Sequence, residues 1–374
     1  MLLNSNMGTA QPHKIKVAMA LMILWVLVRN GRVSCKVVLF IFGDSLIDVG
    51  NNNYLNGTLS KANFPWYGID MGYGKPTGRF TNGRTVADIV GDKMGLPRPP
   101  AFLDPSSTTD VILKNGANYA SGGGGILNET GDLFGQRLSF YRQIELFQGT
   151  REMIVRSIGS DEADVFFKSA QFVVAIGSND FLNNFLLPIY GGFWTYNADE
   201  FINHLLETLE KQLIVSEING IQTLSSKILY LKVLHSMGAR QLTFIGLGPL
   251  GCIPLGRIMN LFGGYQEYVN NLVIKFNNAA NQLLQGLSTH LSDSTMRFSD
   301  AYRMVLEIID NPQKYGFDDS RTPCCTVGVI RPTLTCLPIS SLCKDRTKYV
   351  FWDEFHPTDA ANEIIAHQIM SNIF

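Results

Sequence analysis

The sequence lacks an excess of either charge. It has 31 Lys and Arg residues against 32 Asp and Glu residues, which gives a net charge of −1 at pH 7. Four of the basic residues lie in residues 1–35, which hold no acidic residue, so the rest of the chain has a net charge of −5. Proteins that bind nucleic acid usually carry a basic patch or stripe. We therefore expect no nucleic-acid partner.

Several common functional motifs are also absent. The sequence has no G-x-S-x-G, so it lacks the usual nucleophile elbow of α/β-hydrolases. It has no C-x-x-C, which disfavours a structural zinc site. The four glycines at 122–125 are not followed by G-K-[ST], which excludes a P-loop. "GLGPLG" at 246–251 matches a dinucleotide motif, but Pro249 interrupts it and it lies late in the chain. We expect no metal and no cofactor.

The N-terminus holds an apolar run, but a short one. Residues 17–28 are apolar, follow Lys14 and Lys16, and precede small residues around Cys35. A helix that crosses a bilayer needs roughly 20 apolar residues, so a membrane anchor is the less favoured alternative. The pattern is that of a cleaved secretory signal peptide. We predict that residues 1–35 are a signal peptide and that the protein is secreted, with no stable membrane anchor.

Cysteine is scarce, and four of the six residues lie close together near the C-terminus, at 324, 325, 336 and 343. In an oxidising compartment this spacing predicts disulfides, with the pairing open. If cleavage removes Cys35, one of the five remaining thiols is left over. Two N-glycosylation sequons begin at Asn56 and Asn128, and a secreted chain could carry glycans there.

Apolar patterns predict a single α/β domain over residues 36–374. Continuous β-branched runs at 36–42, 170–177 and 240–248 are typical of buried parallel strands, and 295–302 is a weaker fourth. Helical periodicity occurs at 84–95, 198–213, 265–287 and 358–370, the last with Thr358 as a possible N-cap. Alternating strands and helices predict a mostly parallel sheet that is covered on both faces.

Polar loops follow three of these strands. Gly43-Asp44-Ser45 follows the first, Gly177–Asp180 follows the run at 170–177, and a glycine-rich loop at 118–127 follows a further possible strand. Ligands of open α/β sheets bind beyond the carboxyl ends of the strands. We therefore expect these loops to form a site at one edge of the sheet, with Asp44, Asn51–Asn53 and the glycines beside Gly123 shaping the backbone. Positive φ is the expected reason for glycine at 122, 124 and 125.

A serine nucleophile needs a base, and histidine is also scarce. Of the six histidines, His13 lies in the predicted signal, and His204, His235, His290 and His367 lie in or near helical patterns. His356 differs, because it lies in a loop just before a helix and follows Asp353 by three residues. An Asp-x-x-His turn can hold the carboxylate against one imidazole nitrogen and leave the other free for the serine.

Seven motifs in order resemble one family. They are "FGDSLIDVGNNN", "PTGRFTNGRTVADIV", "GANYASGGGGIL", "VAIGSND", "GARQLTFIGLGPLGCIP", the C-terminal cysteine cluster and "FWDEFHPT". The chain resembles plant-type GDSL esterase/lipases of the SGNH hydrolase superfamily over essentially its whole mature length. The resemblance implies a flavodoxin-like three-layer α/β/α sandwich. It also implies a carboxylic ester hydrolase that works through a Ser-His-Asp triad and an acyl-enzyme.

The resemblance also implies a role for each matching residue. Ser45 matches the nucleophile, and Asp353 and His356 match the other triad members. Gly123, through its backbone N–H, and Asn179, through its side-chain amide, match the donors of the oxyanion hole.

Two alternatives use the same residues. An acyltransferase would pass the acyl group to an alcohol, and a non-catalytic relative would only bind cell-wall or lipid components. The substrate class stays open among small-molecule, lipid and polysaccharide-linked esters. Residues 214–231 interrupt a helix that the family continues, so we predict an insertion there, or a retained intron.

Overall fold

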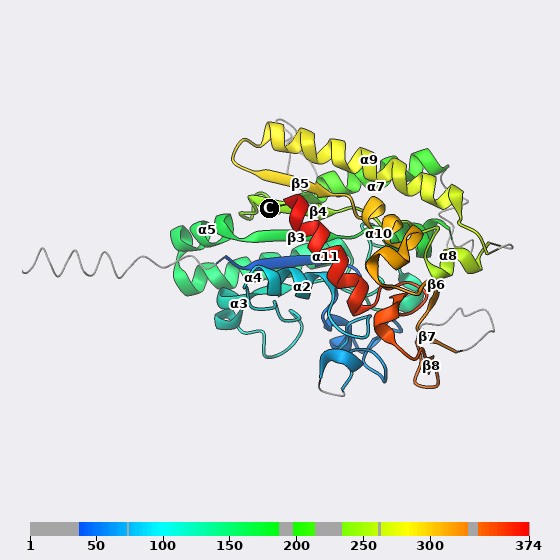
Figure 1. Cartoon of the computed structure of the whole chain (residues 1–374). Coiled ribbons are helices and arrows are strands. Elements are labelled where there is room, and N and C mark those ends of the chain that lie inside the picture. The colour runs from blue at the N-terminus through cyan, green and yellow to red at the C-terminus, as the bar shows by residue number, and fades with distance from the viewer. Residues whose placement is uncertain are drawn as a thin grey trace, which may run out of the picture. The chain divides into compact units, whose positions relative to one another are not determined.

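The computed structural model describes residues 37–72, 75–186, 197–213, 234–260, 263–327 and 336–373 (Figure 1). The predicted signal peptide and the predicted insertion at 214–231 lie outside the described residues.

Five parallel strands form the central sheet. They are β1 (Leu39–Gly43), β2 (Gly116–Asn118), β3 (Gln171–Ala175), β4 (Gln241–Ile245) and β5 (Thr295–Ser299), in the order β2-β1-β3-β4-β5. The chain adds β2 on one side of β1 and then crosses to add β3 on the other side, so the order reverses between β1 and β3. Loops that leave neighbouring strands at such a point diverge and leave a crevice. The expected parallel sheet is confirmed, and its switch point lies beside Ser45.

Strand β1 shows why the sheet is covered on both faces. All five of its residues are buried. The rings of Phe40 and Phe42 lie 5.1 and 5.6 Å from the ring of Phe147 on α4 (Phe140–Ile158). The alternate residues, Leu39 and Ile41, point to the opposite face, because successive side chains of a strand alternate. Neither face of β1 could be left in water, which requires a helical layer on each.

The helices form those two layers (Figure 1). One layer holds α4, α5 (Ser160–Ser169), α7 (Ala198–Leu213) and α9 (Glu267–His290), and the other holds α2 (Val86–Lys93), α10 (Ala301–Asp310) and α11 (Asp359–Ile373). Two short helices, α3 (Thr109–Asn115) and α8 (Pro254–Ile258), lie in the connections. The predicted three-layer α/β/α sandwich is confirmed. Among the described residues, no helix is both long and apolar enough to cross a membrane.

The C-terminal cysteines staple an excursion beside the sheet. Cys324 bonds Cys343 and Cys325 bonds Cys336, while Cys252 is a buried free thiol. This segment carries two short strand pairs, β6 (Asp319–Pro323) with β9 (Tyr349–Phe351) and β7 (Cys325–Thr326) with β8 (Ser341–Leu342). The disulfides pack with Tyr67, Phe80 and Trp352 in a small separate apolar cluster. The expectation of disulfides is confirmed, and the structure decides their pairing.

Candidate active site

Ser45 lies in a tight turn at the carboxyl end of β1. The Asp44 N–H donates to the carbonyl of Ala175 on β3, at 3.1 Å, so the turn begins in contact with the neighbouring strand. A Cβ on Gly43 would collide with that same carbonyl and with the side chain of Ile47. Glycine at 43 is therefore required by the close approach of β1 to β3.

His356 lies between Ser45 and Asp353. Its Nε2 is 2.7 Å from Ser45 Oγ, and its Nδ1 is 2.8 and 2.9 Å from the two carboxylate oxygens of Asp353. The backbone N–H groups of Phe355 and His356 also donate to Asp353, at 2.9 and 2.8 Å. The carboxylate thus closes its own turn and holds the imidazole at once. The structure brings these three residues, 311 positions apart at the extremes, into one hydrogen-bonded chain.

Two aromatic residues, Tyr67 and Phe80, also contact the triad, and the sequence analysis did not identify them. The Tyr67 hydroxyl donates to Asp353 at 2.9 Å, and the Phe80 ring lies 5.2 Å from the imidazole of His356. Both are almost fully buried. The preceding residue, Trp66, has a φ of 84°, an uncommon value for a bulky residue that marks a constrained turn. Nothing in the local pattern around Tyr67 signals its partner, which lies 286 residues away.

Asn179 has an amide that is held from both ends. Its Nδ2 donates to the carbonyl of Gly124 at 2.9 Å, and its Oδ1 accepts from Asn183 at 2.6 Å. Asn183 is in reach because a buried π-helix, Asp180–Phe185, follows directly. π-Helical turns are rare and often occur at functional sites. An amide has two N–H groups, and among the described residues only one acceptor, the carbonyl of Gly124, is bonded to those of Asn179.

Gly123 offers a backbone donor. The N–H groups on either side of it are used, since Gly122 donates to Asp48 at 3.0 Å and Gly124 donates to Ser121 at 3.0 Å. Within the described ranges, no acceptor is bonded to the Gly123 N–H. Gly123 has a φ of 83°, a conformation that glycine adopts without strain.

The prediction of positive φ at the other three glycines of this loop is wrong. Gly122, Gly124 and Gly125 do not have positive φ values. A Cβ at Gly122 would lie 2.5 Å from the ring of Phe80, and one at Gly124 would lie 2.5 Å from the carbonyl of Leu138. These positions need glycine because other groups approach the backbone closely.

Asp48 ties the glycine loop to the Ser45 loop. Its buried carboxylate accepts from the N–H groups of Gly50, Asn51 and Gly122 at 2.7, 2.8 and 3.0 Å. The Asn52 amide donates to the carbonyl of Gly122 at 2.8 Å. The asparagines after the GDS motif therefore do shape the loops, as expected, and they do so by pairing buried backbone groups.

Asp180 holds the same glycine loop from the opposite side. Its carboxylate accepts from Ile126 N–H, Leu127 N–H and the Thr130 hydroxyl at 2.9, 3.0 and 2.7 Å. Buried backbone N–H groups are costly when unpaired, so these bonds fix the path of the loop. The last residue of "GSND" is thus an anchor for the loop that carries Gly123.

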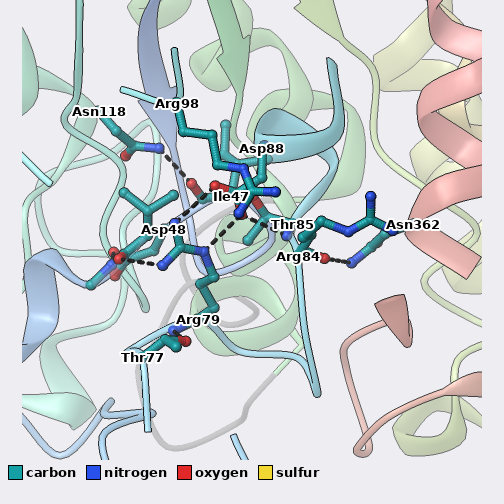
Figure 2. A network of polar contacts seen from close by, with 12 residues as sticks. Ile47, Asp48, Thr77, Arg79, Arg84, Thr85, Asp88, Arg98, Asn118 and Asn362 are labelled. Atoms are coloured by element: carbon teal, nitrogen blue, oxygen red, sulfur yellow. Dashed lines mark hydrogen bonds and ion pairs between the residues drawn. The ribbon is translucent and has the colours of Figure 1, made fainter. Parts of the chain in front are cut away.

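Arg79 and Arg84 belong to a network of polar contacts next to Ile47 and Asp48 of the Ser45 loop (Figure 2). Arg79 makes a bidentate pair with Asp88, at 2.7 and 2.8 Å, and donates to the carbonyl of Val49 at 3.2 Å. Arg84 makes a second bidentate pair with Asp359, the first residue of α11, at 3.0 and 2.9 Å. Because α11 begins three residues after His356, this network fixes the histidine loop relative to the Ser45 loop. Bidentate pairs define geometry better than single bonds.

Four buried carboxyl groups lie in or beside these loops. Burial raises the pKa of Asp44 to about 7, of Asp48 to about 6 and of Asp180 to about 6. Burial and the charge of Asp353 raise the pKa of Glu354 to about 8. Both carboxyl oxygens of Glu354 lack a hydrogen-bond partner among the described residues.

Three of the histidines that the sequence placed in or near helical patterns contact other groups or solvent. His235 contacts Asp293, His290 contacts its own helix backbone, and His367 is exposed on α11. No described residues group three or more His, Cys, Asp or Glu side chains in a way that could hold a metal. The "GLGPLG" segment leads into α8, a helix of only five residues that begins with Pro254.

The sequence is similar to that of known proteins of one family. Residues 39–369 match the family model of GDSL-like lipase/acylhydrolase. GDSL esterase/lipase At1g74460 of Arabidopsis thaliana is 56% identical over 348 residues, which cover 93% of this chain and 90% of the relative. GDSL esterase/lipase At5g37690 of the same plant is 42% identical over 359 residues, which cover 96% of this chain and 95% of the relative.

The raised carboxyl pKa values predict how stability depends on pH. A raised native pKa means that the folded chain binds the proton more tightly than the unfolded chain, so the free energy of unfolding falls as pH rises through that interval. For these four groups the interval runs from about pH 4 to about pH 8. Below it, ion-paired carboxylates such as Asp293, whose pKa is lowered to about 2 mainly by His235, lose their contribution on protonation. We expect the melting temperature to be highest near pH 4–5 and to decline towards pH 8.

Glu354→Gln provides the specific test of this pH dependence. It removes one buried titrating group, so the decline in melting temperature between pH 5 and pH 8 should become shallower than in the unmodified chain. Glu210→Gln, at an exposed position on α7, is the matched control and should leave the slope unchanged. A melting temperature that rises steadily from pH 5 to pH 8 would contradict the prediction.

Proposed function

The chain belongs to the GDSL-like lipase/acylhydrolase family, and we propose that it hydrolyses carboxylic esters with Ser45 as the nucleophile. The observation that carries this proposal is the hydrogen-bonded chain from Ser45 through His356 to Asp353. Nucleophile, base and orienting carboxylate within hydrogen-bond reach are the requirement for activating a serine hydroxyl.

The proposed reaction has two halves. Ser45 Oγ bonds to the ester carbonyl carbon while its proton passes to His356 Nε2, and the carbonyl electron pair moves to the oxygen. When the tetrahedral intermediate collapses, the leaving alcohol takes that proton and an acyl-Ser45 remains. Water then repeats the sequence, with His356 taking its proton and returning one to Ser45. Asp353 stabilises the imidazolium that forms in both halves. The reaction needs no metal and no cofactor.

Three donors support the developing oxyanion in this proposal. They are the N–H groups of Ser45 and Gly123 and the second amide N–H of Asn179. Donors that are fixed in place before the reaction stabilise the charge without reorganising. The anchoring of Asn179 by Asn183 and Gly124 and of the glycine loop by Asp48 and Asp180 provides that fixation.

We also propose that the protein is secreted, with residues 1–35 as the signal peptide and 36–374 as the hydrolase domain. The two disulfides support an oxidising compartment, where such bonds persist. Asn56 and Asn128 are both exposed, so each is accessible to a glycan. The substrates would be small-molecule, lipid or polysaccharide-linked esters, and the insertion at 214–231 stays a prediction.

Replacing the nucleophile tests the proposed chemistry directly. Ser45→Ala should lose nearly all hydrolysis of 4-nitrophenyl acetate, and a fluorophosphonate probe should label the unmodified chain at Ser45 and leave the variant unlabelled. Ser157→Ala, at an exposed position on α4, is the matched control and should retain the unmodified activity. Wild-type activity in purified Ser45→Ala would reject the assignment of the nucleophile.

Failure of the probe to label the unmodified chain would favour a non-catalytic binding protein. A glycerol ester formed in place of free acid when glycerol is added would favour an acyltransferase.

Asn179→Ala tests the oxyanion hole. Removing one such donor typically lowers the rate by about 10²–10³-fold, and the loss should appear in kcat, because the donor acts on the charge that forms in the transition state. The variant should keep its far-ultraviolet circular dichroism spectrum. Asn281→Ala, on the surface of α9, is the control and should retain the unmodified kcat. An Asn179→Ala variant that loses affinity alone would contradict this role.

Tyr67→Phe tests the support of Asp353. The variant should lose about tenfold in kcat/KM, since a hydrogen bond to a charged group contributes about 1.5 kcal/mol or more. The acidic limb of the pH–rate profile should move to higher pH, because more of the Asp353 charge then faces the imidazolium. Tyr54→Phe is the matched control, as it removes a Tyr–Asp bond of 2.7 Å, to Asp104, on the surface. If the acidic limb stayed in place, Tyr67 would have only a packing role.

A further inference from the structure

Gln143 of α4 bonds directly to the backbone that leads into Ser45. Its Oε1 accepts from the Gly43 N–H and its Nε2 donates to the Gly43 carbonyl, both at 2.8 Å. The Nε2 also donates to the carbonyl of Leu138 at 2.9 Å. The side chain is fully buried, so both N–H groups and the oxygen of the amide are bonded inside the protein.

The hydrogen-bond ladder of the sheet explains why an amide is needed at this position. On the β2 side of β1, the Ile41 carbonyl accepts from Tyr119 N–H at 2.7 Å. β2 itself ends at Asn118, and the Gly43 N–H donates to Gln143 instead of to a further strand residue. A carboxamide carries a carbonyl oxygen and N–H groups, as a peptide unit does. Gln143 therefore supplies the partners that the short strand does not.

The same amide is connected to the glycine loop. Ser121 donates its N–H to the Gly43 carbonyl at 3.0 Å, and its hydroxyl accepts from the Leu138 N–H at 3.0 Å. A Cβ on Gly124 would lie 3.4 Å from Gln143 Nε2, so the backbone of the glycine loop passes in contact with the amide. One buried side chain thus joins the Ser45 loop and the glycine loop.

We propose that Gln143 is a positioning residue that sets the spacing of the Ser45 and Gly123 N–H donors of the oxyanion hole. Gly43 and Ser121, which meet beside the amide, each lie two residues before one of these donors. Gln143 is buried, so it acts on the reaction only through the backbone that it holds. A displacement of about 1 Å at a reacting centre can lower a rate by about 10²-fold. The proposal rests on the proposed ester hydrolysis.

Gln143→Met removes these bonds and keeps a side chain of similar length. We expect kcat for 4-nitrophenyl acetate to fall by about tenfold or more, with KM within about twofold, because the donors act on the charge of the transition state. The kcat is expressed per site that a fluorophosphonate probe labels at completion, so misfolded protein is not counted. Gln148→Met, on the same helix, removes a surface bond to Glu152 and is the matched control, with unmodified kcat.

Inhibition by trifluoroacetone shows whether the loss arises at the oxyanion donors. Ser45 Oγ bonds to the ketone carbon, the carbonyl electron pair moves to the oxygen, and the serine proton passes to His356 Nε2. The adduct therefore carries the charge that the donors stabilise, and it has no leaving group. Gln143→Met should weaken this inhibition by about the same factor as it lowers kcat/KM. Unchanged inhibition beside a lowered kcat would overturn the proposal.

Gln143→Glu makes the same contact dependent on pH. A protonated carboxyl group has one carbonyl oxygen and one O–H, so it can accept from Gly43 and donate to it as the amide does. The ionised form has no donor and lies against the carbonyls of Gly43 and Leu138, which repel it. The activity of this variant relative to the unmodified chain should therefore fall reversibly, by about tenfold, between about pH 5 and about pH 9. The buried carboxyl groups of the loops titrate in both proteins, so this ratio cancels their effect, and Gln148→Glu should show a constant ratio.

The outcomes separate this inference from the proposed function. An inactive Ser45→Ala variant together with an unmodified kcat per labelled site in Gln143→Met would overturn the positioning role alone. A relative activity of Gln143→Glu that does not change with pH would also overturn it. If Gln143→Met does not fold, the comparison across pH on one preparation of Gln143→Glu decides. Activity of Ser45→Ala equal to the unmodified chain would overturn the proposed function itself.

Discussion

The requirement that buried backbone groups be paired organises this molecule. Three loops leave the carboxyl edge of the sheet and pass into a buried region where no strand continues to supply partners. Polar side chains supply the partners there: Gln143 exchanges two hydrogen bonds with the backbone of Gly43, Asp48 receives three N–H groups, and Asp180 receives two N–H groups and a hydroxyl. Since a buried unpaired N–H is costly, these contacts leave the loops one path each. The geometry around Ser45 follows from them.

The same contacts have an electrostatic cost. A carboxylate inside the protein loses hydration, and its hydrogen bonds recover only part of that loss, so the pKa values of Asp48 and Asp180 remain above those of exposed aspartates. The molecule keeps charged acceptors in its interior because they orient neighbouring donors. Active sites commonly contain groups whose placement costs free energy locally, and the rest of the fold offsets that cost and keeps the arrangement rigid. Here the aromatic core around β1 and the two helical layers provide that stability.

The two faces of the sheet differ in how they are filled. On the α4 face, Phe40, Phe42, Phe147 and Phe172 pack ring against ring. On the α11 face, aliphatic side chains line two apolar spaces that share Val86, Ile245 and Ile369. The ring packing of the α4 face stabilises the sheet from that side.

Much of the molecule could be predicted from sequence, because the relevant signals are local. The buried strands are continuous apolar runs, the helices have a 3.6-residue period, and Asp353 and His356 lie in one turn whose spacing already favours contact. Ser45, Gly123 and Asn179 lie in polar loops that follow parallel strands, and parallel strands end at one edge, so their proximity followed from the order of elements. The C-terminal cysteines indicated disulfides because they lie close together in the sequence.

Tertiary structure alone decided what depends on contacts between distant segments. The cysteine pairing, the bond from Tyr67 to Asp353 and the network from Arg79 to α2 have no local pattern, since each partner is set by how loops cross in space. The reason for glycine at 122 and 124 is the close approach of Phe80 and Leu138, which φ preferences do not reveal. The apolar space between the sheet and α11 is the clearest case. Most of its wall consists of apolar residues that the sequence does not distinguish from ordinary core, and only the packing of α10 and α11 over the sheet brings them together.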